Sequence, residues 1–210
     1  GGGTISAYRA VATDGAGNEF VDNSCDTTTP CTVTGLTNGT NYTVTIAAVN
    51  EAGVGPLSNT SPAIAPADRA QAVSGLSTVP GDGVLDVTWD EPSSTTELGG
   101  GDFTRYDVSI RPTGGAYGAA VTPDGTNNLA TLVTNSYQFT GLTNGTGYDV
   151  KVEAITDANS SQLVGRTAET SGVPAVAPSA VRDVEAVLVG NTGAFVSWAT
   201  PVSDGGLSIT

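Results

Sequence analysis

The sequence contains no histidine and no methionine, only two cysteines, and a single lysine, Lys151, among its 210 residues. Without histidine, neither a Ser-His-Asp nor a Cys-His catalytic arrangement can be built, and a Cys/His zinc site is excluded as well. The commonest general acid and base of enzymes is missing for the same reason. These absences count against an enzyme, and we expect neither a bound metal nor a cofactor.

Positive charge is also scarce. The seven Lys and Arg residues stand against 21 Asp and Glu residues, which gives a formal net charge of −14. Proteins that bind nucleic acids need clusters of Lys and Arg to neutralise phosphates and release counterions, and docking on an anionic membrane needs them too. We therefore expect no nucleic-acid partner and no membrane partner.

Long apolar runs are absent, because the apolar stretches extend for only a handful of residues, against the roughly 20 that a transmembrane helix requires. Hydrophobic residues nevertheless make up 38% of the chain, which is enough to bury a core. The length fits one large domain or two small ones. The chain is thus expected to fold, without a membrane-spanning helix.

What recurs in the sequence is alternation with a period of two. Residues 42–48 place a tyrosine and three aliphatic side chains on one face and threonines on the other, and residues 148–154 and 84–89 follow the same pattern. Such alternation is typical of half-buried strands in antiparallel sheets. Clusters of Gly, Pro, Asn and Asp separate these segments, as turns require. The pattern predicts an all-β protein built from β-sandwiches.

The sequence repeats itself with a period of about one hundred residues. Residues 34–42 (TGLTNGTNY) recur as residues 140–148 (TGLTNGTGY), an offset of 106. The glycines at residues 1–3 recur at residues 99–101, an offset of 98, and residues 87–89 recur as residues 196–198, an offset of 109. Several copies of one domain, in tandem, are therefore expected.

These motifs resemble the fibronectin type III domain, an immunoglobulin-like β-sandwich, over essentially the whole chain. The resemblance implies a tandem array from a bacterial or archaeal extracellular repeat protein. It also implies roles for six residues: a core tryptophan on strand B, a leucine beneath the corner, and a tyrosine that opens strand F and closes a tyrosine corner. The residues in these roles are Trp89 and Trp198, Leu36 and Leu142, and Tyr42 and Tyr148.

The position of the motifs within the family pattern sets the expected domains. Residues 1–65 supply family strands C to G, residues 66–175 form one complete domain, and residues 176–210 supply strands A and B and the start of C. The predicted junctions, residues 65–68 and 176–179, are short and contain proline, which favours semi-rigid spacing. The two partial domains are complementary, so we expect head-to-tail continuity with neighbouring domains, or with copies of the chain that exchange strands.

Cys25 and Cys31 frame a polar segment between family strands C′ and E. A disulfide is favoured over two free thiols, because exposed thiols so close together would be oxidised. The loop is small, so the chain-entropy model gives a stabilisation of about 2 kcal/mol. Two thiolates without further His or Cys partners do not favour a metal site. An oxidised pair indicates a location outside the cytoplasm.

Two groups of acidic and amide residues raise the alternative of calcium binding. Calcium needs six to eight oxygen ligands, and no loop of regularly spaced Asp residues with a closing Glu is present, so solvated surface acids are favoured. The two groups are Asp14, Asn18 and Glu19, and Asp68, Asp90 and Glu91. Asn-x-Ser/Thr patterns begin at Asn38, Asn41, Asn59, Asn144 and Asn159. For Asn38 and Asn144 we favour turn chemistry over glycosylation.

The sequence thus favours a non-catalytic structural segment of an extracellular or cell-surface array, such as an adhesin stalk, a sheath or a filament. The alternative is a linker or accessory module of a secreted polysaccharide-degrading enzyme. Three aromatic residues could line a binding face, although packing beneath loops is favoured for them. They are Phe20, Tyr117 and Tyr137.

Overall fold

The computed structural model describes residues 3–27, 30–122 and 135–209. All regular structure in this part of the chain is β-strand, and it contains no helix that is long and apolar enough to cross a membrane. The all-β prediction is confirmed. The strands are β1 (Ala7–Asp14), β2 (Glu19–Cys25), β3 (Tyr42–Asn50), β4 (Gly53–Val54), β5 (Ser77–Gly81), β6 (Val84–Thr88), β7 (Asp102–Pro112), β8 (Ser136–Phe139), β9 (Tyr148–Ala158), β10 (Ser161–Val164), β11 (Ala168–Gly172), β12 (Arg182–Val189) and β13 (Gly193–Ala199).

The chain divides into two compact units, and the boundary between them crosses strands β7 and β9. The first unit consists of residues 1–71, 92–105 and 154–166. The second consists of residues 72–91, 106–153 and 167–210.

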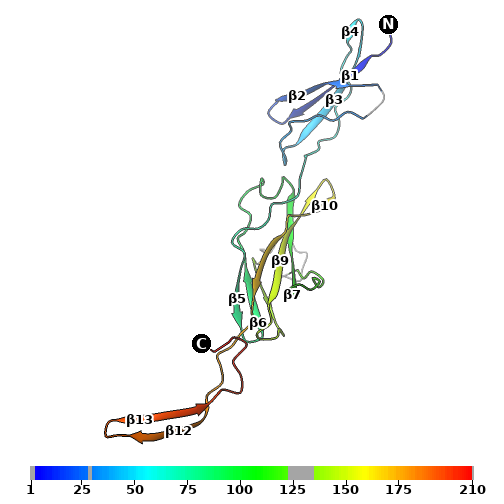
Figure 1. The fold of residues 1–210 in the computed structure, drawn as a ribbon. Coiled ribbons are helices and arrows are strands. Elements are labelled where there is room, and N and C mark those ends of the chain that lie inside the picture. Colours follow the sequence, from blue (N-terminus) through cyan, green and yellow to red (C-terminus); the bar gives the residue numbers. More distant parts are fainter. Residues whose placement is uncertain (1–2, 28–29, 123–134, 210) are drawn as a thin grey trace. The chain divides into compact units, whose positions relative to one another are not determined.

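In the first unit, strands β2, β1, β3 and β4 form an antiparallel sheet in that order (Figure 1). Ala10 and Ala12 of β1 and Tyr42 of β3 are buried, and the ring of Phe20 packs edge-on against Tyr42 with the ring centres 5.5 Å apart. Phe20 is therefore a packing residue of this sheet.

The last strand of this sheet, β4, is only two residues long. Beyond it the chain continues along β3, to which it is joined by hydrogen bonds from two serine residues. The backbone N–H groups of Ser58 and Ser61 donate to the carbonyls of Ile46 and Val44. In return, the hydroxyl oxygens of the two serines accept the N–H groups of Ile46 and Val44, at 3.0 and 2.9 Å. Side-chain oxygens thus replace the carbonyls of a regular ladder.

Residues 31–34 of the first unit, where family strand E was expected, form no strand. The offset of 106 makes them equivalent to the residues that begin at Tyr137 in β8, and β8 pairs with β6. The described chain before residue 31 holds no counterpart of β6. Since a strand needs a hydrogen-bonded neighbour, residues 31–34 stay irregular.

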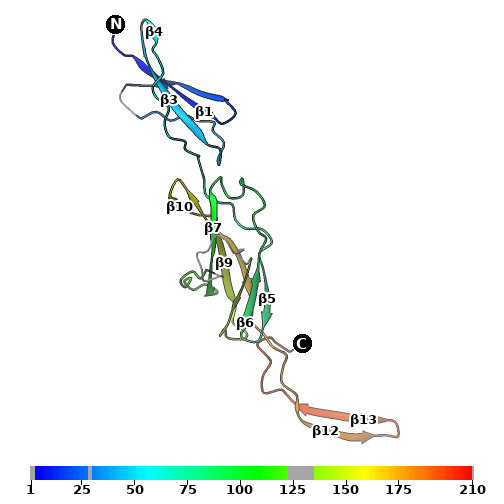
Figure 2. The same cartoon turned by 180° about the vertical axis from the view of Figure 1, so that it is seen from behind.

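The second unit holds a sandwich core. Strands β5, β6 and β8 form one sheet, while β9 pairs with β7 and β11 in another. In both views β5 and β6 run alongside β9 (Figures 1 and 2). Leu85 and Val87 of β6 and Val150 and Val152 of β9 are fully buried, as their alternation predicts.

Two further hairpins complete the description. In the first unit, β9 turns into β10 through Asn159 and Ser160, which both have positive φ, as a two-residue type I′ turn requires. In the second unit, β12 and β13 pair only with each other among the described residues (Figure 1). Every residue of β12 is exposed.

Candidate functional site

Two tyrosines tie the backbone of the repeat together from inside the fold. The hydroxyl oxygen of Tyr42 accepts the backbone N–H of Thr37 at 3.0 Å, and that of Tyr148 accepts the N–H of Thr143 at 3.1 Å. Both rings are buried. Leu36 and Leu142, which precede the two threonines in sequence, are half-buried. Each tyrosine therefore satisfies a turn donor that would otherwise lack an acceptor.

Trp89 lies at the centre of the second unit with 2% of its surface exposed. Its ring packs edge-on against Tyr106, with the ring centres 5.0 Å apart and an interplanar angle of 77°. Burial raises the pKa of Tyr106 to about 12, although the contact with Trp89 acts in the opposite direction. This pair is a packing centre of the second unit.

Trp198 corrects the expectation that both tryptophans are core residues, because it is 60% exposed. The offset of 109 makes Trp198 the counterpart of Trp89, so the same motif is buried in one copy and open in the other. The cause is the missing sheet. Trp89 has Tyr106 to pack against, whereas the described chain holds no sheet for the β12–β13 hairpin. Val184, Leu188 and Val196 of the hairpin are exposed as well.

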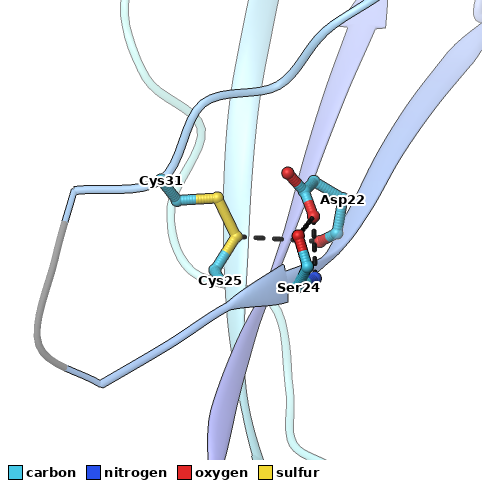
Figure 3. The surroundings of a disulfide bond; sticks show 4 residues. All are labelled: Asp22, Ser24, Cys25 and Cys31. Atoms are coloured by element: carbon cyan, nitrogen blue, oxygen red, sulfur yellow. Dashed lines mark hydrogen bonds between the residues drawn. A yellow bond between two sulfur atoms is a disulfide. The ribbon is translucent and has the colours of Figure 1, made fainter.

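A disulfide joins Cys25 to Cys31, with the two Cα atoms 5.1 Å apart (Figure 3). Cys25 is the last residue of β2 and is buried, so one end of the bond is anchored in the sheet; Cys31 is not fully buried. Asp22 and Ser24 lie beside it, where the Asp22 carboxylate accepts the side-chain and backbone donors of Ser24. These hydrogen bonds hold the pKa of Asp22 below its ordinary value, and the one from the Ser24 hydroxyl has the largest effect.

Among the described residues, the one group of three side chains close enough to share a metal ion is Asp22, Cys25 and Cys31. Its two sulfur atoms are bonded to each other, so neither is a thiolate, which is the form that binds metals. The remaining carboxylate already accepts hydrogen bonds from Ser24. This group does not form a metal centre.

Asp14 and Asp68, one from each group considered for calcium, form contacts within the protein. The Asp14 carboxylate accepts the backbone N–H groups of Ala16 and Asn18 and the side-chain amide of Asn18, at 2.8–2.9 Å. The side-chain amide of Asn18 is the main cause that lowers the pKa of Asp14. Asp68 forms an ion pair with Arg166 at 3.5 Å. Neither group is among the sets of three acidic, Cys or His side chains that lie close enough to share a metal ion in the described part of the chain.

The outer face of β7 and β9 carries a charged cluster that was not predicted from the sequence. Arg111 bonds to Asp149 at 3.0 Å, and Lys151 bonds to Glu153 at 3.0 Å. The ring of Tyr117 lies 4.2 Å from the Arg111 guanidinium and 5.3 Å from the Lys151 ammonium. The signal in the sequence that could have revealed this cluster is the alternation of negative and positive charge at residues 149, 151 and 153.

The same cluster shifts two pKa values. Burial raises the pKa of Tyr117, and its hydrogen bond to Glu169 acts in the same direction. Partial burial alone would raise the pKa of Asp149, but the hydrogen bonds from Thr113 and Arg111 outweigh it, so the net pKa is lowered. Tyr117 therefore packs beneath cations, as expected of packing under a loop, and Tyr137 packs against Phe139 with the ring centres 4.8 Å apart.

Two of the Asn-x-Ser/Thr asparagines use their amide groups inside the fold. Asn144 accepts the Gly83 N–H at 2.8 Å and donates to Asp82 at 2.7 Å. Asn159 donates to the carbonyl of Ala65 at 2.8 Å. A glycan at either residue would replace one of the two amide hydrogens and would have to fit beside these contacts, which favours turn chemistry over a glycan at Asn144.

Comparison with known proteins identifies the repeat. The family model for the Fibronectin type III domain matches residues 1–64 and residues 71–166. This chain belongs to the fibronectin type III family. Members of this family are typically non-catalytic modules, commonly structural or adhesive. No curated protein matches the chain.

Two solved structures illustrate the relation. The FN1–FN3 domains of chicken CNTN1 share 22% sequence identity with a TM-score of 0.40; the match covers 93% of this chain and 66% of that chain, just under two thirds. A segment of two fibronectin type III domains from chicken tenascin shares 19% identity with a TM-score of 0.43, over 81% of this chain and 85% of that chain.

Proposed function

We propose that this chain is a non-catalytic segment of a long extracellular array of fibronectin type III domains, of the kind found in adhesin stalks, sheaths or surface filaments of bacteria or archaea. Residues 1–65, 66–175 and 176–210 then belong to three successive domains. Neighbouring domains, or copies of the chain, are its partners.

The observation that carries this proposal is that the chain presents the two complementary halves of one sandwich. Trp198 is 60% exposed whereas its counterpart Trp89 is buried. In the first unit, Ile46 is 43% exposed whereas its counterpart Val152 is fully buried. Two residues that are buried in the sandwich of the second unit, Trp89 and Val152, thus have exposed counterparts, one in the hairpin and one in the first unit. Exposed apolar residues gathered on one face favour association with a partner.

The surface chemistry supports the same proposal. The disulfide at Cys25 and Cys31 suits an oxidising location outside the cytoplasm. The net charge of −14 keeps a long chain soluble and discourages unspecific binding to nucleic acids. The buried tryptophan, the tyrosine corners and the charged cluster all serve packing, so a structural role accounts for them.

Denaturing electrophoresis of the native material, detected with an antibody raised against residues 66–175, tests the array. The recombinant 210-residue chain serves as the size marker, and all samples are reduced. We expect a polypeptide much larger than 20.9 kDa, with the signal in the cell-surface fraction. A band that migrates with the marker would refute the covalent array and leave strand exchange between separate copies.

A further inference from the structure

Two places in the chain are built alike, each from three glycines at equivalent positions of the repeat. In the first place the glycines are Gly39, Gly99 and Gly100, and in the second they are Gly145, Gly205 and Gly206. All six have φ between +66° and +96°, a region that favours glycine. The offset between the two sets is 106 at each position. We call these places the first joint (residues 38–39, 66–68 and 99–100) and the second joint (residues 144–145, 174–176 and 205–206).

The same backbone hydrogen bonds close both joints. In the first, Gly39 N–H donates to the Pro66 carbonyl and Asp68 N–H donates to the Gly99 carbonyl, both at 2.9 Å. In the second, Gly145 N–H donates to the Pro174 carbonyl and Val176 N–H donates to the Gly205 carbonyl, again at 2.9 Å. The first joint lies entirely within the first compact unit and the second entirely within the other, so the two are independent observations.

A third hydrogen bond extends each joint by three residues. Gln71 N–H donates to the Glu97 carbonyl at 2.7 Å, and at the equivalent positions Ser179 N–H donates to the Ser203 carbonyl at 3.0 Å. The segment between two repeats is therefore held on both sides. The Asn-Gly turn that precedes the corner tyrosine donates an N–H to the proline carbonyl of this segment. Carbonyls at and just before the Gly-Gly turn of the following repeat accept N–H groups from the residues of the segment that come after the proline.

The two glycine turns also touch each other, without room for a side chain. A Cβ atom on Gly100 would lie 2.6 Å from the carbonyl carbon of Asn38, and one on Gly206 would lie 2.8 Å from that of Asn144. A Cβ atom on Gly39 would lie 3.1 Å from the Gly100 Cα. Because the obstructing atoms belong to the backbone, no change of rotamer relieves the overlap.

We propose that these residues form a preassembled joint that couples each fibronectin domain to the next: the Asn-Gly turn of one domain is an interaction surface whose partner is the Gly-Gly turn of its successor. Close backbone contact and fixed hydrogen bonds replace a large apolar interface. The joint stiffens the connection wherever both turns and the Pro-Ala linker are present. It holds in this chain whether or not the chain belongs to a longer array.

Amide hydrogen exchange on the full 210-residue chain, measured by NMR, tests the joint. The reporters are the Gly39 and Gly145 amides, which should be protected in the wild-type chain. Gly100→Ala should accelerate exchange at Gly39 by about three- to tenfold, the range expected for one hydrogen bond, and leave Gly145 unchanged. Gly206→Ala should do the reverse. Each variant is thus a control for the other.

Gly35→Ala and Gly141→Ala are the matched controls. These glycines have φ of +80° and +71°, so they bear the same conformational penalty, yet nothing lies within 4 Å of a Cβ atom on either. Both controls should leave the exchange of the two reporters unchanged. The proposal is overturned if the wild-type reporters exchange at unfolded rates, or if Gly100→Ala behaves like Gly35→Ala.

A second measurement covers the case in which Gly100→Ala fails to fold, which circular dichroism would reveal. Gly39→Ala alters the same contact from the side of the preceding domain, and it leaves the sequence of residues 66–175 unchanged. Its readout is ¹⁵N relaxation. In the wild type, β3 and β7 should share one rotational correlation time, and in Gly39→Ala the two should separate. Equal correlation times in the variant, or separate ones in the wild type, would contradict the joint.

Discussion

Replacing Trp89 with alanine removes the largest fully buried side chain among the described residues. The indole is 2% exposed and packs edge-on against Tyr106 at 5.0 Å. Its loss leaves a cavity between the sheets, which the surrounding strands can fill only in part. It also leaves the buried Tyr106 hydroxyl without the indole beside it.

The structure sets the size of the effect. Truncation of a buried tryptophan to alanine costs about 3–5 kcal/mol of unfolding free energy, which includes the cavity. An edge-to-face aromatic pair contributes about 0.5–1.5 kcal/mol of that loss beyond its burial. Trp198→Ala is a control at the equivalent position of the repeat. Because Trp198 is 60% exposed, its removal should cost less than about 1 kcal/mol.

The assay must report on the second unit alone, so we choose native-state hydrogen exchange of the amides in residues 148–153, the part of β9 that lies in this unit, at low protein concentration. In Trp89→Ala the slowest of these amides should lose protection that corresponds to about 3–5 kcal/mol. In Trp198→Ala they should exchange as in the wild type. A loss below about 1 kcal/mol for Trp89→Ala would show that the sandwich is not packed around this ring.

Three further predictions concern the corners, the disulfide and acid. Tyr42→Phe and Tyr148→Phe each remove an acceptor for a turn N–H, and each should lower the free energy of unfolding in urea by about 1 kcal/mol. Unchanged midpoints would show that the corner hydrogen bonds do not contribute to stability. Alkylation of non-reduced protein should modify neither Cys25 nor Cys31, and intact mass should show two modified thiols only after reduction; two modified thiols without reductant would contradict the bond. Because the folded pKa of Asp149 is lowered, its stabilisation is present above the ordinary value of about 3.9 and is lost as the pH falls through the folded pKa. Asp149→Asn should therefore lower the melting temperature at pH 7 and flatten its decline below about pH 4, whereas parallel curves for both proteins would refute this role.

The strands could be predicted because their signal is local. Alternation over residues 42–48 and 148–154 identifies β3 and β9, and the tyrosine that opens each segment identifies the corner. The family resemblance then assigned the roles of Trp89 and Tyr148. Such features depend on neighbours a few residues away, or on a motif that recurs within the chain.

The features that the sequence pattern could not predict depend on other segments that pack against or pair with a given residue. Trp198 lies in the same motif as Trp89, yet it is exposed because none of the sheets that the structure describes covers its hairpin. Residues 31–34 have the composition of a strand and form none, because the described residues hold no strand that pairs with them. The glycine joints also escaped prediction. Each glycine fits an ordinary turn, and only the folded chain brings Gly39 against Gly100.

The scarcity of basic side chains has a consequence for the survival of such a chain among secreted proteases. An enzyme that cuts after lysine or arginine finds seven candidate bonds in 210 residues. Several of these side chains are already held: Arg69 donates to the carbonyls of Val164 and Gly165 at 2.6 and 2.7 Å, and Lys151 is bound to Glu153. Cleavage at these bonds must wait for local opening of the fold around them, so the rate of digestion would measure how often the folded chain opens locally.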